Sequence, residues 1–240
     1  MPPRSPNHLV LLILLVSLAS CVLLGSCVSP STHPPAQSAP VATVVDAAMS
    51  EAEAFDGLSP NCPAEIRQRQ TLLSVSYYGF DGQVHRGQIV IDRELAEEVQ
   101  EIFAIALNEK FPITSVIPVS APQFRDEGEL DRSGSVWSDR LSMAANNTSG
   151  FNYRWIEGTT KPSTHSIGRA IDINPRINPY IRGETILPPD GTYAANVPGT
   201  LTEESVVTRA FLDRGWEWGG HWTSLKDYQH FEKPRPPAQP

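Results

Sequence analysis

The chain has 240 residues, with 27 acidic against 19 basic side chains and a formal net charge of −8 at pH 7. An acidic chain of this kind lacks the basic surface that nucleic-acid binding needs, so we expect no nucleic-acid partner. Once a targeting segment is set aside, the length suits one domain with its own hydrophobic core.

Residues 1–27 resemble a secretion signal with a lipidation site. The polar start is followed by the apolar run Leu9–Ala19, which has the length of a signal-peptide core and is short for a membrane span. Cys21 and Cys27 each follow small residues, as in the bacterial lipobox whose cysteine is acylated, so either is a candidate. Two alternatives stay open: a signal cleaved without lipidation, and an anchor helix retained up to Leu24.

Residues 28–59 are rich in Pro, Ser and Ala and predict a flexible tether. The folded domain is expected over residues 60–233, followed by a Pro-rich tail at 234–240. A tethered anchor would hold the domain in the cell envelope, facing the periplasm or the outer surface, whereas simple cleavage of the signal would secrete it. Cys62 has no obvious partner in a lipidated chain and no activating base nearby, so we expect a structural thiol.

The first half of the domain has the clearest periodicity. Two β-branched and aromatic runs, 72–78 and 84–91, flank a glycine-containing turn and predict a pair of strands. Asp92 is expected to cap a helix whose apolar residues recur on one face. These residues are Leu95, Val99, Ile102, Phe103 and Ala106. Residues 113–119 predict another strand.

The remainder of the domain mixes loops with short elements. Residues 123–140 and 178–198 predict long loops, and residues 141–155 show no clear period. The capping-box pattern at 200–203 predicts a helix that ends at Gly215. Short strands are expected at 167–173, 216–218 and 228–231. Two good helices among short strands, without regular βαβ alternation, predict an α+β fold.

The segment STHSIGRAIDINP, residues 163–175, carries the most informative chemistry. It sets His165 and Asp172 seven positions apart, and Asp227 and His230 follow downstream. Two His and one Asp can bind zinc and leave a fourth position for water, which is typical of a catalytic site. Spacing alone leaves a structural role equally open, because an isolated His is more often structural.

Two ordered motifs carry a family resemblance: Ser163-x-His165-x-x-Gly168-x-Ala170-x-Asp172, and Asp227-x-x-His230. They resemble those of the zinc-dependent peptidoglycan peptidases, which include D-alanyl-D-alanine carboxypeptidases, dipeptidases and L-alanyl-D-glutamate endopeptidases. Matching stretches such as YYGFDGQVHRG, SMAANNTSGFNYR and DYQHFE extend the resemblance over most of the domain and look closest to the endopeptidase-like subgroup. The resemblance implies a hedgehog/DD-peptidase-like α+β fold, with a small antiparallel sheet packed against helices.

The resemblance also implies roles for individual residues. The matches to the zinc ligands are His165, Asp172 and His230. Asp227 matches the general base that takes a proton from the attacking water and passes it to the leaving amine, and Glu232 is the next candidate. Arg154 matches, more loosely, an arginine that binds substrate or the developing oxyanion. A surface carboxylate at Asp227 and a surface salt bridge at Arg154 are the structural alternatives.

Other polar residues are less settled. Ser163 is expected to hydrogen-bond near the site and to contact substrate. His221 stands where the family leads us to expect an acidic residue after the WGG sequence. It could contact substrate, titrate with pH, act as a neutral replacement or compete as a metal ligand. His85 lies far from the ligand spacing and is expected to be structural.

The resemblance therefore implies a zinc peptidase that hydrolyses peptidoglycan stem peptides by metal-activated water, at either the D-Ala-D-Ala or the L-Ala-D-Glu bond. The expected partners are peptidoglycan peptides and a membrane reached through the anchor, and a monomer is expected. The main alternative is a non-catalytic peptidoglycan-binding lipoprotein on the same fold. A metal-binding periplasmic protein is a third possibility.

Overall fold

The computed structural model describes residues 43–128, 130–156 and 159–235. The expected signal, both candidate lipidation cysteines, the tether up to residue 42 and the end of the tail lie outside these residues. Within the described ranges, no helix combines the length and apolar character needed to cross a bilayer.

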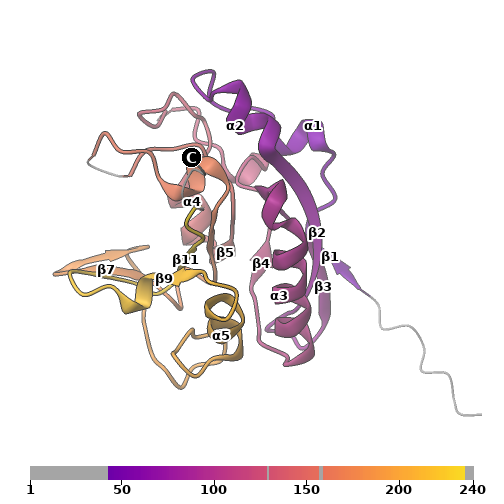
Figure 1. Ribbon diagram of the computed structural model, residues 1–240, viewed down its shortest axis with the longest axis vertical. Helices are drawn as coiled ribbons and strands as arrows, with labels where there is room; N and C mark the ends of the chain where they lie inside the picture. Colours follow the sequence, from indigo (N-terminus) through magenta and orange to yellow (C-terminus); the bar gives the residue numbers. More distant parts are fainter. Residues whose placement is uncertain (1–42, 129, 157–158, 236–240) are drawn as a thin grey trace, which may run out of the picture. The chain divides into compact units, whose positions relative to one another are not determined.

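The longest strands form a hairpin near the start of the fold. β2 (Gln70–Tyr78) and β3 (Val84–Asp92) pair antiparallel over their whole length, and the short β1 (Val44–Val45) adds to β3 in parallel. The predicted strand pair at 72–78 and 84–91 is therefore confirmed, with β2 starting two residues earlier. This sheet is the curved ribbon on the right of Figure 1.

The predicted helix after Asp92 is also confirmed. The Asp92 side chain accepts a hydrogen bond from the backbone N–H of Glu94 at 3.1 Å, which starts the 3₁₀ turn η1 (Arg93–Leu95). The turn continues as α3 (Ala96–Asn108), whose apolar residues are buried as expected. The sequence pattern alone was enough here, because the cap and the apolar face are both local signals.

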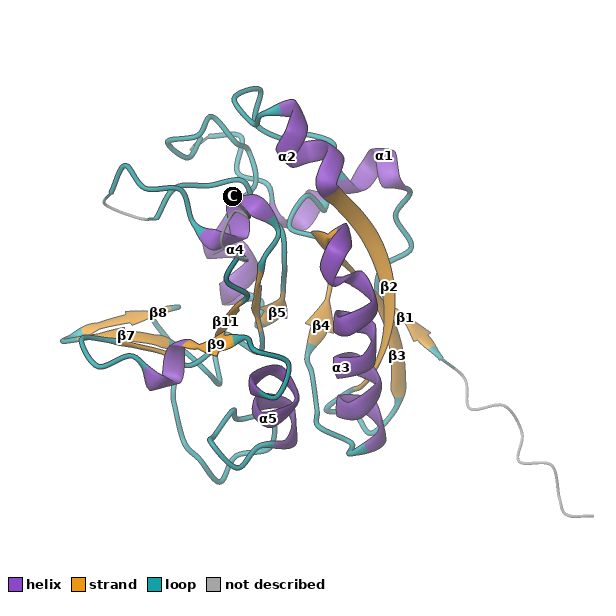
Figure 2. Ribbon diagram, in the orientation of Figure 1, coloured by secondary structure: helices purple, strands orange, loops and turns teal. Residues whose placement is uncertain are grey.

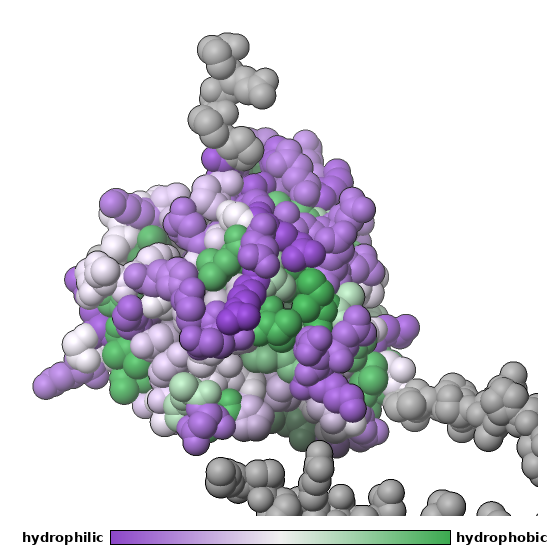
Figure 3. Space-filling model, turned by 60° about the horizontal axis from the view of Figure 1, so that its bottom comes forward, coloured by the Kyte–Doolittle hydropathy of each residue, from purple (hydrophilic) through white to green (hydrophobic). Residues whose placement is uncertain are grey.

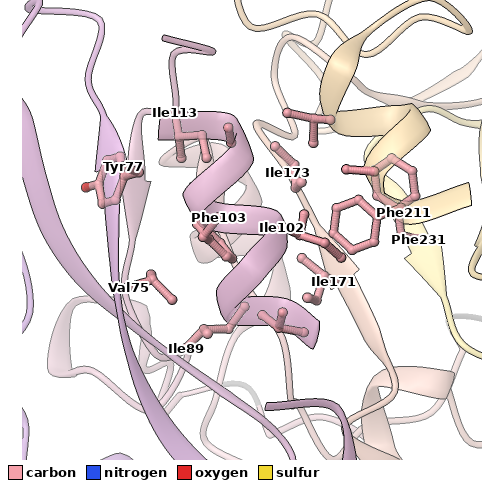
Figure 4. Close-up of a cluster of buried hydrophobic side chains, with 14 of the residues drawn as sticks. Val75, Tyr77, Ile89, Ile102, Phe103, Ile113, Ile171, Ile173, Phe211 and Phe231 are labelled. Atoms are coloured by element: carbon pink, nitrogen blue, oxygen red, sulfur yellow. The ribbon is translucent and has the colours of Figure 1, made fainter. Parts of the chain in front are cut away.

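α3 lies between the hairpin sheet and the second half of the fold. Figure 4 shows Phe103 on the side of Val75 and Tyr77, whereas Ile102 faces Ile171 and Phe231. All six side chains are less than 4% exposed. A helix buried on two sides fixes the strand that carries Ile171 against the hairpin, and this strand also carries a predicted ligand.

The second half of the fold consists of short elements. A three-stranded antiparallel sheet has the order β6-β11-β9, formed by β6 (Ala170–Asp172), β11 (His230–Glu232) and β9 (Glu217–Trp218). α5 (Val206–Leu212) packs beside it, with the rings of Phe211 and Phe231 stacked at 4.1 Å. Figure 2 shows how much of this half is loop.

The other short elements complete the described fold. They are the helices α1 (Glu51–Ala54), α2 (Ala64–Arg69) and α4 (Asp139–Ala144), the 3₁₀ turns η2 (Pro122–Phe124), η3 (Thr164–Ile167) and η4 (Gly219–His221), the parallel pair β4 (Ser115–Val116) and β5 (Asn147–Thr148), and the sheet formed by β7 (Tyr180–Arg182), β8 (Thr185–Leu187) and β10 (Lys226–Asp227). The mixture of helices and small sheets agrees with the predicted α+β class.

The end of the expected tether belongs to the folded unit. β1 pairs with β3, and Ser50 forms a capping box with Glu53 at the start of α1. Phe55 is 8% exposed and packs 6.2 Å from the ring of Phe151 in a second apolar cluster. The expected boundary at residue 60 is therefore too late, because the contacts that order this segment come from residues far along the chain.

Three local expectations differ from the structure. The strand expected at 113–119 shrinks to β4, and α4 and the β7–β8 hairpin lie in segments expected to be irregular. The capping box expected at 200–203 does not form, since α5 begins only at Val206. The Glu203 carboxylate instead contacts His221.

Large apolar side chains are mostly hidden. On the face shown in Figure 3, hydrophobic residues form separate patches between hydrophilic ones. Among the described residues, the exposed large hydrophobic side chains are Val45, Phe80, Leu130, Ile156, Ile186 and Val197. Isolated exposed residues of this kind are ordinary in soluble domains.

Candidate metal centre

The structure brings together the three side chains predicted to bind zinc. One nitrogen or oxygen each from His165, Asp172 and His230 lies within 4.8 Å of the others, and all three residues are buried. They come from η3, β6 and β11, so the cluster joins segments about 60 residues apart in the sequence. Charged groups are seldom buried together unless they pair or coordinate a metal.

A short turn places His165. The Ser163 hydroxyl accepts a hydrogen bond from the His165 backbone N–H at 3.3 Å and caps η3. The turn ends at Gly168, whose φ of 67° is left-handed. A Cβ at Gly168 would also overlap the Gln70 amide oxygen and lie 2.8 Å from the backbone nitrogen of Asp92. The glycine is therefore required both for its conformation and for its lack of a side chain.

Strand register places the other two side chains. Asp172 on β6 and His230 on β11 are directly opposed in the antiparallel pair. Opposed residues point to the same face of a sheet, so the carboxylate and the imidazole meet without any special loop geometry. Ile171 and Phe231 alternate to the other face and are fully buried in the core. The two ligand candidates are thus held by core packing on the reverse side of their strands.

The distances suit a small metal ion. His165 Nε2 lies 3.2 Å from His230 Nδ1 and 3.1 Å from the nearer Asp172 oxygen. The other Asp172 oxygen lies 3.0 Å from His230 Nδ1. Nitrogen and oxygen ligands bound tetrahedrally to zinc at about 2.0–2.1 Å lie roughly 3.3 Å from one another. The spacing of the cluster is close to that value.

The remaining ring nitrogens show which atoms face the centre. His165 Nδ1 donates to the backbone carbonyl of Gly150 at 2.7 Å. His230 Nε2 lies 3.2 Å from Glu232 Oε2, which as a carboxylate oxygen can only accept. In the neutral imidazoles, the nitrogens that face Asp172 are then lone-pair donors. Three electron-pair donors converge on one point, and such a set is stabilised by a cation.

The local electrostatics also favour positive charge. Burial opposes protonation of His230, but hydrogen bonds to Asp172 and Glu232 outweigh it and raise the pKa of His230 to about 10. Burial likewise opposes ionisation of Asp172, yet the charges and hydrogen bonds of His165 and His230 lower the pKa of its carboxyl. The residues present therefore fit a divalent cation, and their nitrogen and oxygen donors are those that zinc accepts.

Asp227, the expected general base, lies on β10 beside this cluster. Its Oδ1 is buried without a hydrogen-bond partner among the described residues. Burial raises the pKa of Asp227 to about 6. The negative charge of Asp172 adds to this rise, and the charge of His230 partly offsets it. Gly219 packs so closely on Asp227 that a Cβ there would lie 2.8 Å from the Asp227 Cβ. A half-buried carboxylate with a pKa near neutrality is suited to proton transfer.

Arg154, the expected substrate arginine, is tied to the turn that carries His165. Its backbone N–H donates to the Ser166 hydroxyl at 3.0 Å, and its carbonyl accepts from the Ser163 N–H at 3.1 Å. Its guanidinium forms an ion pair with Asp139 on α4 at 3.0 Å. The guanidinium Nε is buried without a partner among the described residues, so one donor remains available for a ligand.

A cavity of about 560 Å³ adjoins this arginine. Its walls include Asp139, Met143, Arg154, Trp155 and Pro188. None of the three clustered ligand candidates lines it. The connection to the centre is instead through the backbone bonds of Arg154 described above. The cavity therefore offers apolar surface and the ion pair between Arg154 and Asp139, beside the turn that carries His165.

The other expected site residues lie at the edges. His221 on η4 is half exposed, and its Nε2 contacts the Glu203 carboxylate rather than the cluster. Its ring packs 5.2 Å from Trp218. Ser163 is buried, and its hydroxyl serves the turn that carries His165. His85, expected to be structural, lies between Asp46 and Asp81 on the hairpin sheet.

The sequence did not predict the positions that two residues, Asp139 and Glu232, take beside the site. Asp139 was included in an expected surface loop, and only its place after the N-cap Ser138 hints at a helix. Glu232 was expected only as a reserve base, yet its carboxylate lies beyond the far nitrogen of His230, on the edge opposite Nδ1. The spacing of two from His230 along a strand was the available signal, because such residues share a face.

Comparison with known proteins supports the resemblance. Residues 157–233, less than half of the chain, match a family described as D-alanyl-D-alanine carboxypeptidase. This segment includes the three clustered side chains and Asp227. Neither the curated proteins nor the solved structures give a match to this chain. The predicted resemblance is confirmed at the level of the family, without its subgroup: residues 157–233 are similar to the D-alanyl-D-alanine carboxypeptidase family of peptidases.

Proposed function

We propose that this chain is a zinc-dependent peptidase that hydrolyses peptidoglycan stem peptides, on a DD-peptidase-like fold. The observation that carries the proposal is the convergence of His165 Nε2, His230 Nδ1 and the Asp172 carboxylate, with the outer ring nitrogens already engaged. Binding of a metal ion is the chemistry that would use the three atoms that face one another, His165 Nε2, His230 Nδ1 and the Asp172 carboxylate. The family match supports peptidoglycan stem peptides as the class of substrate.

The residues around the centre divide the reaction between them. A zinc ion held by His165, Asp172 and His230 would polarise the scissile carbonyl and make water a better nucleophile. Asp227 is the proton carrier: its carboxylate accepts a proton from the attacking water and returns it to the leaving amine nitrogen. Its buried Oδ1 and raised pKa support this role.

Arg154 is proposed to bind the peptide. The Asp139 carboxylate holds its guanidinium at the cavity wall, and the unpartnered Nε points to a further acceptor. A peptide carbonyl or carboxylate in the cavity would satisfy that donor. The cavity would thus orient the stem peptide, while the cluster and Asp227 act on the bond to be cut.

The bond that is cut can be identified directly. Purified full-length protein loaded with zinc is incubated with muropeptides, and the products are analysed by mass spectrometry. Loss of a terminal alanine identifies a D-Ala-D-Ala carboxypeptidase, whereas separation of L-Ala from D-Glu identifies an endopeptidase. Asp227→Asn is the matched control, since it removes the proton carrier and keeps the side-chain shape. Binding of muropeptides without any product would instead favour the non-catalytic peptidoglycan-binding protein.

We further propose that the enzyme is anchored in the cell envelope. The support is the lipobox-like sequence around Cys21 and Cys27 and the Pro-rich segment that follows. We expect detergent partitioning of the full chain to be lost when both cysteines are replaced by serine. Unchanged partitioning of the double variant would contradict lipidation.

A further inference from the structure

Glu232 lies two residues after His230 on β11. Residues at this spacing in a strand point to the same face of the sheet. The Glu232 carboxylate accordingly lies beside the His230 ring, with Oε2 at 3.2 Å from Nε2. The Glu232 side chain is 25% exposed and that of His230 is 7% exposed, so the contact lies at the edge of the buried centre.

The contact involves the nitrogen that faces away from the ligand cluster. His230 Nδ1 is turned to Asp172 at 3.0 Å and to His165 at 3.2 Å. Nε2 is on the opposite edge of the ring and contacts only groups outside the cluster. A carboxylate there accepts the Nε2 proton, and this leaves the lone pair on Nδ1.

One neutral group competes for the same nitrogen. Thr164 Oγ1 lies 3.4 Å from His230 Nε2, slightly farther than Glu232. A hydrogen bond to an ionised acceptor is the stronger of the two kinds. Glu232 is therefore the dominant partner of Nε2.

We propose that Glu232 is a positioning residue for the metal centre. It fixes the His230 tautomer with the proton on Nε2, holds the ring with Nδ1 turned toward the cluster, and raises the affinity of Nδ1 for zinc. This inference rests on the zinc site of the proposed function and deepens it. It also assigns Glu232 a role different from that of the base, since its carboxylate lies beyond the ring edge opposite Nδ1.

The test is zinc affinity of the full-length protein, measured by competition with a chromophoric chelator. Loss of an outer partner of a metal-binding histidine typically lowers metal affinity about 10- to 100-fold. We expect Glu232→Ala to fall toward the 100-fold end and Glu232→Gln, which keeps an oxygen acceptor, toward the 10-fold end. Glu217→Ala is the matched control, because Glu217 is exposed and directly opposes Glu232 on β9.

A second measurement separates positioning from general destabilisation. Cobalt substituted into the centre reports ligand orientation through its visible absorption, so we expect an altered spectrum in both Glu232 variants and an unchanged one in Glu217→Ala. Should Glu232→Ala fail to fold, the isosteric Glu232→Gln decides the question by the same two readouts.

The outcomes are distinguishable. Tight zinc binding by the wild type, together with wild-type affinity and spectrum in the folded Glu232 variants, overturns the role of Glu232 alone. A wild-type protein that binds no zinc overturns the proposed function and this inference together. Graded loss from Gln to Ala, with Glu217→Ala unaffected, is the result that supports it.

Discussion

Two sites in this molecule combine buried histidine with aspartate side chains, and they differ in geometry. On the hairpin sheet, His85 Nδ1 lies 2.8 Å from Asp46 and Nε2 lies 2.9 Å from Asp81. Each of its ring nitrogens thus has its own carboxylate, on opposite edges of the ring. In the ligand cluster, nitrogens from two rings turn toward one shared carboxylate, and the outer edges are bound elsewhere.

The difference separates a histidine with a structural role from a candidate metal ligand. His85 is already satisfied on both edges and stacks 5.3 Å from Tyr77, so a metal would have to break existing contacts. At His165 and His230, the outer nitrogens are engaged and the inner ones point to a common centre. The direction of the ring nitrogens, more than the number of nearby carboxylates, therefore distinguishes the candidate metal site from the His85 site.

The sharpest test of this contrast is to replace one histidine at each of the two sites. We expect about one zinc per chain in the wild type, and almost none in His165→Ala, because two remaining ligands rarely hold zinc. His85→Ala should keep its zinc. Metal analysis after dialysis measures both. Equal zinc content in the wild type and His165→Ala, or loss of zinc from His85→Ala, would place the metal elsewhere.

Asp227 tests whether the centre is catalytic as well as metal-binding. We expect Asp227→Asn to keep its zinc and to lower kcat by about 10²–10⁴-fold, the usual contribution of a positioned acid–base group. Muropeptide turnover and zinc content are measured on the same preparation. Near wild-type turnover in a zinc-loaded Asp227→Asn would show that another group carries the proton. Glu217→Gln serves as a control, because that carboxylate is exposed.

Arg154 extends the comparison to the cavity. If its guanidinium stabilises the developing oxyanion, Arg154→Ala should lower kcat by about 10²-fold, as loss of one such donor does. If it binds only the ground state of the peptide, KM should rise and kcat should stay constant. Steady-state kinetics separate the two roles. Unchanged kcat and KM would show that Arg154 does not act on the substrate and that its ion pair with Asp139 is structural.

The sequence predicted those parts of the fold that depend on local signals. The hairpin strands, the cap at Asp92 and the apolar face of α3 all follow from patterns within a few residues. α4 and the β7–β8 hairpin were missed because they are short and owe their stability to tertiary contacts. Phe55 was assigned to a tether for the same reason, since its burial depends on residues such as Phe151.

The site divides in the same way. The motifs and the resemblance pointed to His165, Asp172 and His230, and β-strand register explains how the last two come to face each other. The sequence could not predict which ring nitrogen faces the centre, so the contact between Glu232 and the outer nitrogen was not foreseen. The expected capping role of Glu203 is wrong. Its carboxylate contacts His221, which is 18 residues away in the sequence and could not be paired with it from local patterns.

The smallest expected effect concerns the pH dependence of stability at His85. Burial opposes its charge, but the hydrogen bonds to Asp81 and Asp46 prevail and raise the pKa of His85 in the folded protein. Its stabilising contribution is then complete below the unfolded pKa of about 6.5 and is lost as pH rises through the higher folded pKa. We expect His85→Phe to lower the free energy of unfolding by about 1.5–3 kcal/mol at pH 5.5, the range for hydrogen bonds to charged groups, and by less at pH 9. Denaturant unfolding at the two pH values measures the difference, and a loss independent of pH would show that His85 acts by packing alone.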